Sequence, residues 1–322
     1  MIINFVGLFN QPGYVGEISD ETHIARELEK LGHTVNKVPR DVWKAYCDGD
    51  RNPDWVLPIK ADINLIAKWH HFNKGSYIQS LAVMSVAPVF YWVWDYMWDG
   101  GFPDWHINMA AVADLYLSGE VGIFHEYIKL GVKPYYFQMD VCDGDIPTFD
   151  YDYHHKTYDV IFTGSCIDQG HRKEWLQEIN KEIPVIIFAW NPDEWFKLGF
   201  KECYPAVYGE DYNRIIAQSK IVLGFSVEPN CWGYWSNRVG KVLRAGGFLL
   251  QEYAPGMETQ LNDIGFFSSP QEAIEKIKKY LDAEKPFITD RERWTSAWKV
   301  SELVALMERY LKGDPTKWNK LP

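Results

Sequence analysis

The sequence predicts an α/β protein with two Rossmann-like domains. Short β-branched or aromatic runs alternate with amphipathic segments in both halves of the chain, and this alternation is typical of parallel sheets covered by helices. A polar, turn-rich stretch without periodicity, residues 140–153, separates the halves. The length of 322 residues exceeds one typical core. We therefore expect domains at 1–150 and 151–293, with a last helix, 294–311, that packs back onto the first domain.

Composition restricts the function classes. The chain is 47% hydrophobic and 24% charged, as expected of a globular protein. Aromatic residues make up 16% and include 15 Trp; such rings fill cores, and they also stack on sugars or bases in ligand sites. The net charge of −11 argues against nucleic acid as the main partner, because phosphate binding requires a basic surface.

The cysteines and the hydropathy pattern point to no metal site and no membrane span. The five Cys form no CxxC pair, so neither a disulfide framework nor a zinc site is indicated. The N-terminus lacks the basic region of a signal peptide. No apolar run approaches the roughly 18 residues of a membrane span. We expect a cytoplasmic protein.

The first half begins as a Rossmann-type unit. A strand at 2–9 leads into a glycine-containing loop, and Ser19 is the expected N-cap of a helix that ends at Gly32. The loop does not have GxGxxG spacing, so no dinucleotide fingerprint is inferred. The remaining elements expected in this half are a strand at 55–58, a helix at 63–69, strands at 88–94, 115–118 and 135–137, and a helix at 120–130.

In the second half, the stretch from Ser236 to Glu258 has the most informative pattern. Its first part has helical spacing, with an apolar face and with Arg238 and Lys241 on another face. Gly246-Gly247 ends this helix, an apolar strand follows, and Pro-Gly turns the chain before Glu258. Such a unit can bind a phosphorylated ligand through the cations and its sugar through the acid. The alternative is a surface helix whose cations are solvated.

A second motif opens this half of the chain. The strand at 158–162 is followed by Thr163-Gly164-Ser165 and then by Arg172. A small loop of this kind exposes backbone N–H groups to a diphosphate, and Arg172 can balance its charge. The other elements expected here are a strand at 184–190, a helix at 208–219, strands at 220–226 and 266–267, and a helix at 270–281.

Together these motifs resemble the donor-binding signature of GT-B glycosyltransferases, especially the spore-maturation CgeB-like group, and more distantly the phage DNA β-glucosyltransferases. The resemblance implies a GT-B fold, in which two Rossmann-like domains face each other across a cleft. It also implies a nucleotide-diphosphate sugar as co-substrate, with a UDP-sugar favoured and no tightly bound cofactor or metal.

The resemblance assigns the donor-binding residues. They are Gly164, Ser165, Arg172, Trp190, Tyr208, Arg238, Lys241, Gly247 and Glu258. Of these, Trp190 is either stacked on the nucleobase or part of the core. Lys241 departs from the family, which carries a ribose-binding Glu at this position. Because Lys cannot accept hydrogen bonds from ribose hydroxyls, Glu258 or Glu252 becomes the candidate substitute.

The resemblance also suggests an acceptor side in the first domain. Asp95 follows an aromatic strand, and the carboxyl end of a parallel strand is where open α/β sheets bind ligands. Asp95 is thus the candidate general base for an acceptor hydroxyl, or else the cap of the following turn. Trp94, Trp98, Glu17 and Glu21 are further acceptor-side candidates. The two glutamates have an alternative role in stabilising a helix N-terminus.

The sequence therefore favours a glycosyltransferase that acts on a saccharide or small-molecule hydroxyl. Two alternatives remain: a DNA glycosyltransferase that modifies hydroxymethylated bases, and an inactive module that binds sugar nucleotides. The sugar, the nucleotide, the acceptor, the inverting or retaining outcome and the oligomeric state stay open at this stage.

Overall fold

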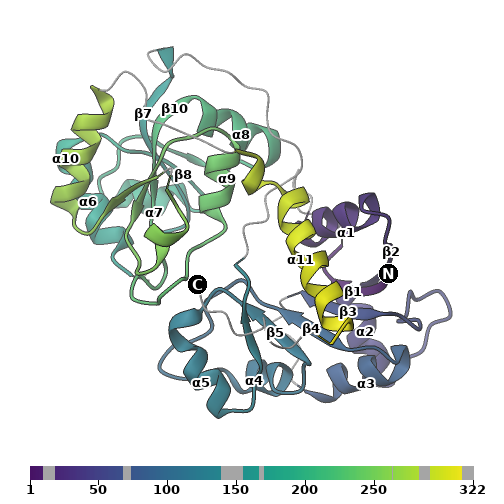
Figure 1. Ribbon diagram of the computed structural model, residues 1–322. Helices are drawn as coiled ribbons and strands as arrows, with labels where there is room; N and C mark the ends of the chain where they lie inside the picture. The colour runs from purple at the N-terminus through teal and green to yellow at the C-terminus, as the bar shows by residue number, and fades with distance from the viewer. Residues whose placement is uncertain are drawn as a thin grey trace. The chain divides into compact units, whose positions relative to one another are not determined.

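The computed structural model describes residues 1–9, 19–67, 74–138, 155–166, 170–262, 264–282 and 291–313. The chain forms two compact units, residues 1–139 with 296–322 and residues 140–295. Each unit holds one six-stranded sheet in which every pair of neighbouring strands is parallel (Figure 1). The predicted α/β class with two Rossmann-like halves is confirmed.

In the first unit the strand order is β2-β1-β3-β4-β5-β6. The strands are β1 (Ile2–Gly7), β2 (Thr34–Pro39), β3 (Ile63–Ala67), β4 (Val89–Trp92), β5 (Leu115–Ser118) and β6 (Pro134–Tyr136). The helices are α1 (Asp20–Lys30), α2 (Arg40–Cys47), α3 (Ser76–Ser85), α4 (Asp104–Ala110), the 3-10 turn η1 (Val121–Ile123), α5 (Phe124–Lys129) and α11 (Ser296–Leu311).

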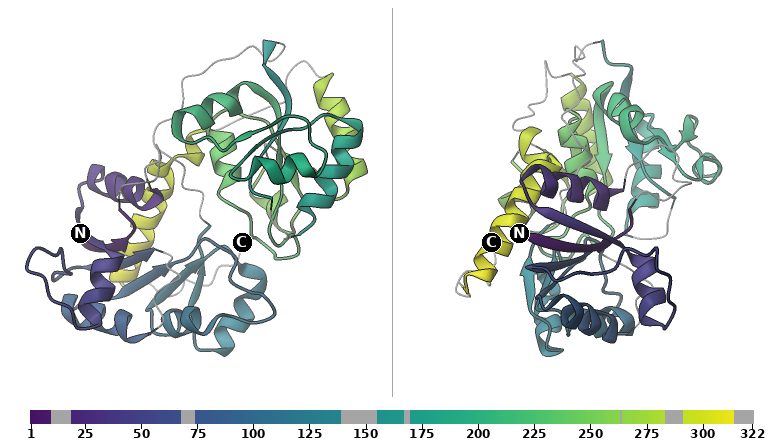
Figure 2. Two further views of the ribbon diagram at one scale, coloured as in Figure 1. Left: turned by 180° about the vertical axis from the view of Figure 1, so that it is seen from behind. Right: turned by 90° about the vertical axis from the view of Figure 1, so that its right-hand side faces the viewer.

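Helices cover both faces of this sheet (Figure 2). Along β4, alternate residues face opposite ways, as the pleat requires. Tyr91 belongs to a buried cluster that includes Trp43 of α2 and Met109 of α4. Its neighbour Phe90 packs edge-on against Tyr310 of α11, with ring centroids 5.0 Å apart. The C-terminal helix α11 therefore completes the core of the first unit.

A row of three asparagines, two of them fully buried, fixes the register of three strands. Asn4 of β1 lies opposite Asn36 of β2 and Asn64 of β3. The Asn4 amide donates to Asn64 Oδ1 at 3.0 Å, and the Asn36 amide donates to Asn4 Oδ1 at 2.8 Å. A slip of one residue would leave the buried amides of Asn4 and Asn64 without these partners, so the row favours a single register.

In the second unit the strand order is β12-β11-β10-β7-β8-β9. The strands are β7 (Tyr158–Thr163), β8 (Ile186–Ala189), β9 (Cys203–Pro205), β10 (Ser219–Gly224), β11 (Leu249–Glu252) and β12 (Gly265–Phe267). The helices are α6 (Arg172–Glu182), α7 (Pro192–Lys197), α8 (Gly209–Ala217), α9 (Arg238–Arg244), α10 (Pro270–Leu281), and the 3-10 turns η3 (Met257–Thr259) and η4 (Arg291–Trp294). Because β7, β10 and β11 are neighbours, the loops after them meet at one edge of the sheet.

Two predictions for the first half are wrong. The sequence predicts a helix at 63–69, but Ile63–Ala67 is the fully buried strand β3 between β1 and β4. A run of five apolar and amide residues has no helical period, and its burial on both faces is typical of a central parallel strand. The strand expected at 55–58 is absent, because these residues have no strand partner in the described chain.

Candidate functional site

The strongest candidate site lies at the carboxyl edge of the second sheet. There the guanidinium groups of Arg172 and Arg238 both lie against the ring of Phe162, at 5.7 and 5.3 Å from its centroid. Phe162 belongs to β7, Arg172 begins α6 and Arg238 begins α9. The fold therefore brings together two arginines that are 66 residues apart in the sequence (238 minus 172).

The loop after β7 makes room for these cations. A Cβ on Gly164 would lie 2.9 Å from Arg238 Nη2, so only glycine leaves the guanidinium its present position. The carbonyl of Ser165 accepts a hydrogen bond from Arg172 Nη1 at 3.3 Å. The sequence prediction groups Gly164, Ser165, Arg172 and Arg238, and the structure places these four together.

Arg172 is a cation in an unfavourable position. It is 4% exposed, and its Nε has no hydrogen-bond partner among the described residues. Burial, followed by repulsion from Arg238, lowers the pKa of Arg172 to about 10, while Glu252 acts in the opposite direction. Burial also lowers the pKa of Arg238. Two desolvated positive charges, together with an Nε–H group that has no partner among the described residues, favour the binding of an anion.

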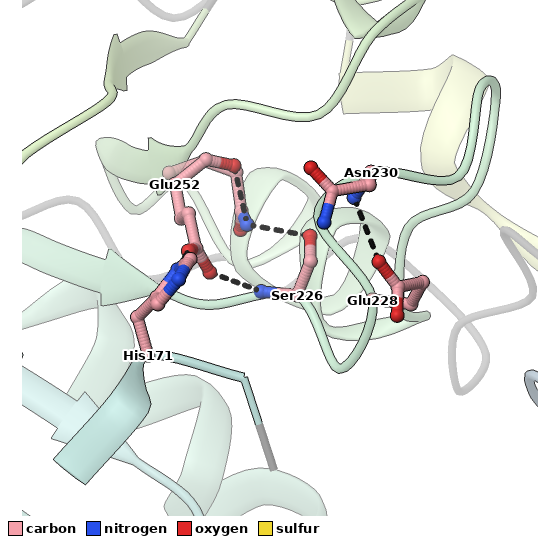
Figure 3. Close-up of polar contacts among 6 residues, drawn as sticks. His171, Ser226, Glu228, Asn230 and Glu252 are labelled. Atoms are coloured by element: carbon pink, nitrogen blue, oxygen red, sulfur yellow. Dashed lines mark hydrogen bonds and ion pairs between the residues drawn. The ribbon is translucent and has the colours of Figure 1, made fainter. Parts of the chain in front are cut away.

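Glu252 is the buried acid of this edge. It ends β11, is 1% exposed, and accepts hydrogen bonds from the backbone N–H of Ser226 at 3.1 Å and from His171 Nδ1 at 2.9 Å. Figure 3 shows its carboxylate between His171 and Ser226. Burial raises the pKa of Glu252, and His171, the Ser226 N–H and Arg172 lower it in part.

Trp190 and Tyr208 form an aromatic pair at the same edge. Trp190 directly follows β8 and is 68% exposed, and Tyr208 precedes α8. Their ring centroids are 5.5 Å apart, with an interplanar angle of 55°. The exposure of Trp190 excludes the core role that the sequence leaves open. An exposed indole beside a sheet edge can stack on a flat ligand group.

The remaining donor-side predictions are Gly247, Glu258 and Lys241. Gly247 packs where a Cβ would collide with Ile216 Cγ2, which is a structural contact. Glu258 is exposed and hydrogen-bonds Tyr253. Lys241 is half-buried on α9, one turn after Arg238.

In the first unit, Asp95 is half-buried in the loop that follows β4. Trp94 packs edge-on against Trp92, at 5.6 Å between ring centroids, and Trp98 packs against Phe102, at 4.7 Å. Glu21 is buried beneath the end of β1, where burial raises its pKa to about 7. Glu17 lies outside the described residues.

Sequence reasoning misses Glu120, which holds the loop that carries Asp95. Glu120 is fully buried two residues after β5, and its Oε1 accepts a hydrogen bond from the backbone N–H of Met97. Its Oε2 accepts a hydrogen bond from the hydroxyl of Tyr127 at 2.8 Å. Tyr127 in turn lies 2.9 Å from His106 Nε2, so a buried polar network supports this loop.

We expect Glu120→Gln to change how stability depends on pH. Burial raises the pKa of Glu120 from 4.5 to about 7. Between these values the unfolded chain releases the proton and the folded chain keeps it, so the stability contribution of Glu120 falls as pH rises and is constant above pH 7. The loss amounts to about 3 kcal/mol and is absent in the variant. Urea unfolding at pH 5 and pH 8 measures it; an equal pH dependence in both proteins would contradict the assignment.

Within the described residues, no group of three or more His, Cys, Asp or Glu side chains is placed to hold a metal ion. No helix among them is long and apolar enough to cross a membrane.

Residues 172–314 match a protein-family model described as glycosyl transferase-like. This segment contains Arg172, Arg238 and Glu252. No curated protein sequence matches the chain.

The chain is similar in structure to several solved proteins along nearly its whole length. One is a glycosyltransferase of avilamycin A biosynthesis, with a TM-score of 0.57, 11% identity, and coverage of 97% of this chain and 98% of that one. A DNA-modifying β-glucosyltransferase has a TM-score of 0.56, 12% identity, and coverage of 97% and 98%. The N-terminal domain of Candida albicans trehalose-6-phosphate phosphatase has a TM-score of 0.59, 9% identity, and coverage of 96% of both chains. The fold is GT-B, as predicted.

Proposed function

We propose that this protein is a glycosyltransferase that uses a nucleotide-diphosphate sugar as donor. The observation that carries the proposal is the pair Arg172 and Arg238 on one phenylalanine ring, where the buried Nε of Arg172 has no hydrogen-bond partner among the described residues. A diphosphate supplies a negative charge opposite the two guanidinium groups. Their positive charge also stabilises the diphosphate when it leaves the sugar. The match of residues 172–314 to a glycosyl transferase-like family supports the assignment.

In this proposal the donor site is the carboxyl edge of the second sheet. Arg172 and Arg238 bind the diphosphate together with the loop at Gly164 and Ser165, and Trp190 with Tyr208 stacks on the base. A UDP-sugar is favoured because the similar DNA-modifying β-glucosyltransferase has uridine diphosphoglucose as its substrate. Lys241 and Glu258 complete the proposed donor contacts. Gly247 has a structural role only, because a Cβ at this position would collide with Ile216. The CgeB-like group remains the proposed relationship.

The acceptor side is proposed to lie at the carboxyl edge of the first sheet. Asp95 removes the proton from an acceptor hydroxyl as the hydroxyl oxygen attacks the anomeric carbon. The bond between C1 and the diphosphate oxygen breaks at the same time, and its electron pair stays on the diphosphate. Trp94 and Trp98 supply apolar surface to the acceptor, which we take to be a saccharide or a small molecule. The side chains of two arginines supply positive charge, so we propose that transfer needs no metal ion.

Thermal unfolding with a panel of UDP-, GDP-, ADP-, CMP- and dTDP-sugars tests the donor. We expect one nucleotide to raise the melting temperature, because a ligand that binds only the folded chain stabilises it by RT ln(1 + [L]/Kd). Arg238→Ala removes one of the two cations and should abolish the shift. EDTA should leave it unchanged.

Arg214→Ala is the matched control. Arg214 is an exposed arginine on α8 that pairs with Asp211 at 3.0 Å, and its loss should preserve the shift. Failure of every nucleotide to stabilise the wild-type protein, at concentrations up to the millimolar range, would overturn the proposed donor class.

A further inference from the structure

The side chain of Asn191 joins the loop after β8 to the loop after β7. Asn191 directly follows Trp190, and its Oδ1 accepts a hydrogen bond from the backbone N–H of Cys166 at 3.3 Å. Its Nδ2 group donates to a carboxylate oxygen of Glu194 in the first turn of α7. A carboxylate accepts hydrogen bonds, so the Nδ2 group faces Glu194 and the oxygen faces Cys166. Both ends of the Asn191 side chain are therefore fixed.

Trp195 forms a second connection between the same two loops. It is fully buried in α7, and its indole N–H donates to the carbonyl oxygen of Gly164 at 3.2 Å. Its ring packs edge-on against Phe162, with centroids 5.6 Å apart. Phe162 is the residue whose ring contacts both guanidinium groups of the arginine pair. The segment that begins at Trp190 is thus attached to the loop and to the ring of the proposed phosphate site.

These connections link the two parts of the proposed donor site. On one side, the exposed Trp190 is the chain neighbour of Asn191. On the other side, Cys166 follows Ser165, whose carbonyl accepts a hydrogen bond from Arg172. The bond between Asn191 and Cys166 therefore lies between the aromatic residue that is proposed to stack on the base and the loop that is proposed to bind the phosphates.

We propose that Asn191 is a positioning residue that fixes the spacing between Trp190 and the loop at Gly164–Cys166, and that this spacing selects nucleoside diphosphates over nucleoside monophosphates. The inference rests on the proposed function and adds the selectivity of its site. A diphosphate reaches the arginine pair while its base stacks on Trp190, whereas a monophosphate is one phosphate unit too short. A rigid spacing favours the longer ligand, because its second contact forms within the complex and orders no further part of the chain.

The test is the Kd of UDP, UMP and pyrophosphate, measured by calorimetry at pH 8 for the wild type and Asn191→Ala. We expect the wild type to bind UDP about 100-fold more tightly than UMP. The variant leaves the N–H of Cys166 without this acceptor and loosens the spacing, so the affinity for UDP should fall about tenfold. The affinities for UMP and pyrophosphate should not change, because each of these ligands uses only one part of the site.

Asn180→Ala is the matched control. Asn180 of α6 is half-buried, as Asn191 is, and its Oδ1 accepts a hydrogen bond from the backbone N–H of Val185 at 3.1 Å. Val185 precedes β8, so this bond lies at the amino end of the strand, away from Trp190. The control loses a comparable hydrogen bond and should keep all three wild-type affinities.

A second variant, at the exposed residue Glu194, changes the orientation of Asn191 without changing the buried chain. Glu194→Ala removes the acceptor of the Asn191 amide, so the affinity for UDP should fall in the same direction as in Asn191→Ala, to a smaller extent. A wild-type affinity for UDP in both variants would overturn the positioning role.

The effect of Asn191 should also require Trp190. In a Trp190→Ala background the ligand has no indole to stack on, so Asn191→Ala should no longer change the Kd of UDP. An equal loss in both backgrounds, or an equal loss of UDP and pyrophosphate affinity, would show that Asn191 shapes the phosphate loop alone. Either result would overturn the spacing role.

The remaining outcomes separate this inference from the proposed function. Wild-type protein that binds UMP as tightly as UDP, or an Asn191→Ala variant with the wild-type ratio of the two Kd values, would overturn the inference and leave the proposed donor site intact. Lack of UDP binding by the wild type at concentrations up to the millimolar range would overturn the proposed UDP-sugar site, and this inference with it.

Discussion

Replacement of Arg172 by Met should weaken nucleotide-sugar binding about 100-fold and at the same time raise the melting temperature of the ligand-free protein. Without a ligand, Arg172 is a buried cation beside a second arginine, and its Nε has no hydrogen-bond partner in the part of the chain that the structure describes. Met fills a similar volume and removes the desolvated charge, and such replacements stabilise proteins by about 1–3 kcal/mol. Thermal unfolding with and without UDP-glucose measures both effects. A variant that is more stable but binds the nucleotide sugar more weakly would show that Arg172 serves ligand binding at a cost to stability.

Arg214→Met is the control for this prediction. Arg214 is half exposed and carries ion pairs to acids on its own helix, so its loss should change neither the stability nor the affinity by much. If Arg172→Met instead destabilises the ligand-free protein, Arg172 is a structural cation, and the anion site loses its main support.

Most of the fold can be predicted because its signals are local. The helix at 270–281 is predicted with the bounds that the structure has, since Ser269 caps its start and a proline opens its first turn. The run 63–67 is misassigned because a short apolar segment buried on both faces has no period of its own. Its identity as a strand is set by its neighbours β1 and β4. Asn64 pairs there with Asn4 and Val89, which are 60 and 25 residues away in the sequence (64 minus 4 and 89 minus 64).

The candidate site is predictable only where a motif carries it. The sequence points to Arg172 and Arg238 because each follows or opens a recognisable element, and the structure places both on Phe162. Glu252 ends an apolar strand just as Asp95 follows one, so the same pattern indicates it. Its partner His171 cannot be found in this way, because the pairing joins residues 81 positions apart.

The support of the Asp95 loop shows a second limit of sequence reasoning. The sequence presents Glu120 as the polar start of a helix, but it is fully buried and binds the backbone N–H of Met97. The partners of Glu120 come from β5, α5 and the loop after β4, and only the fold brings these segments together. A buried acid beneath a loop restricts the positions that the loop can take. Asp95, two residues before Met97, is thereby held near the carboxyl edge of its sheet.

Asp95→Asn should therefore lower kcat by about 100-fold or more and leave the affinity for the nucleotide sugar unchanged. The amide keeps the shape of the side chain but cannot take a proton from the acceptor hydroxyl, and general-base catalysis contributes roughly 10²–10⁴ in rate. Product formation with an acceptor found by screening, together with calorimetry of donor binding, separates the two quantities. Asp99→Asn, an exposed acid in the same loop, should behave as wild type. Full turnover in Asp95→Asn would exclude Asp95 as the base. The next residue to test would then be Glu21, the buried acid of α1 that lies beside the end of β1, because its pKa near 7 suits proton transfer at neutral pH.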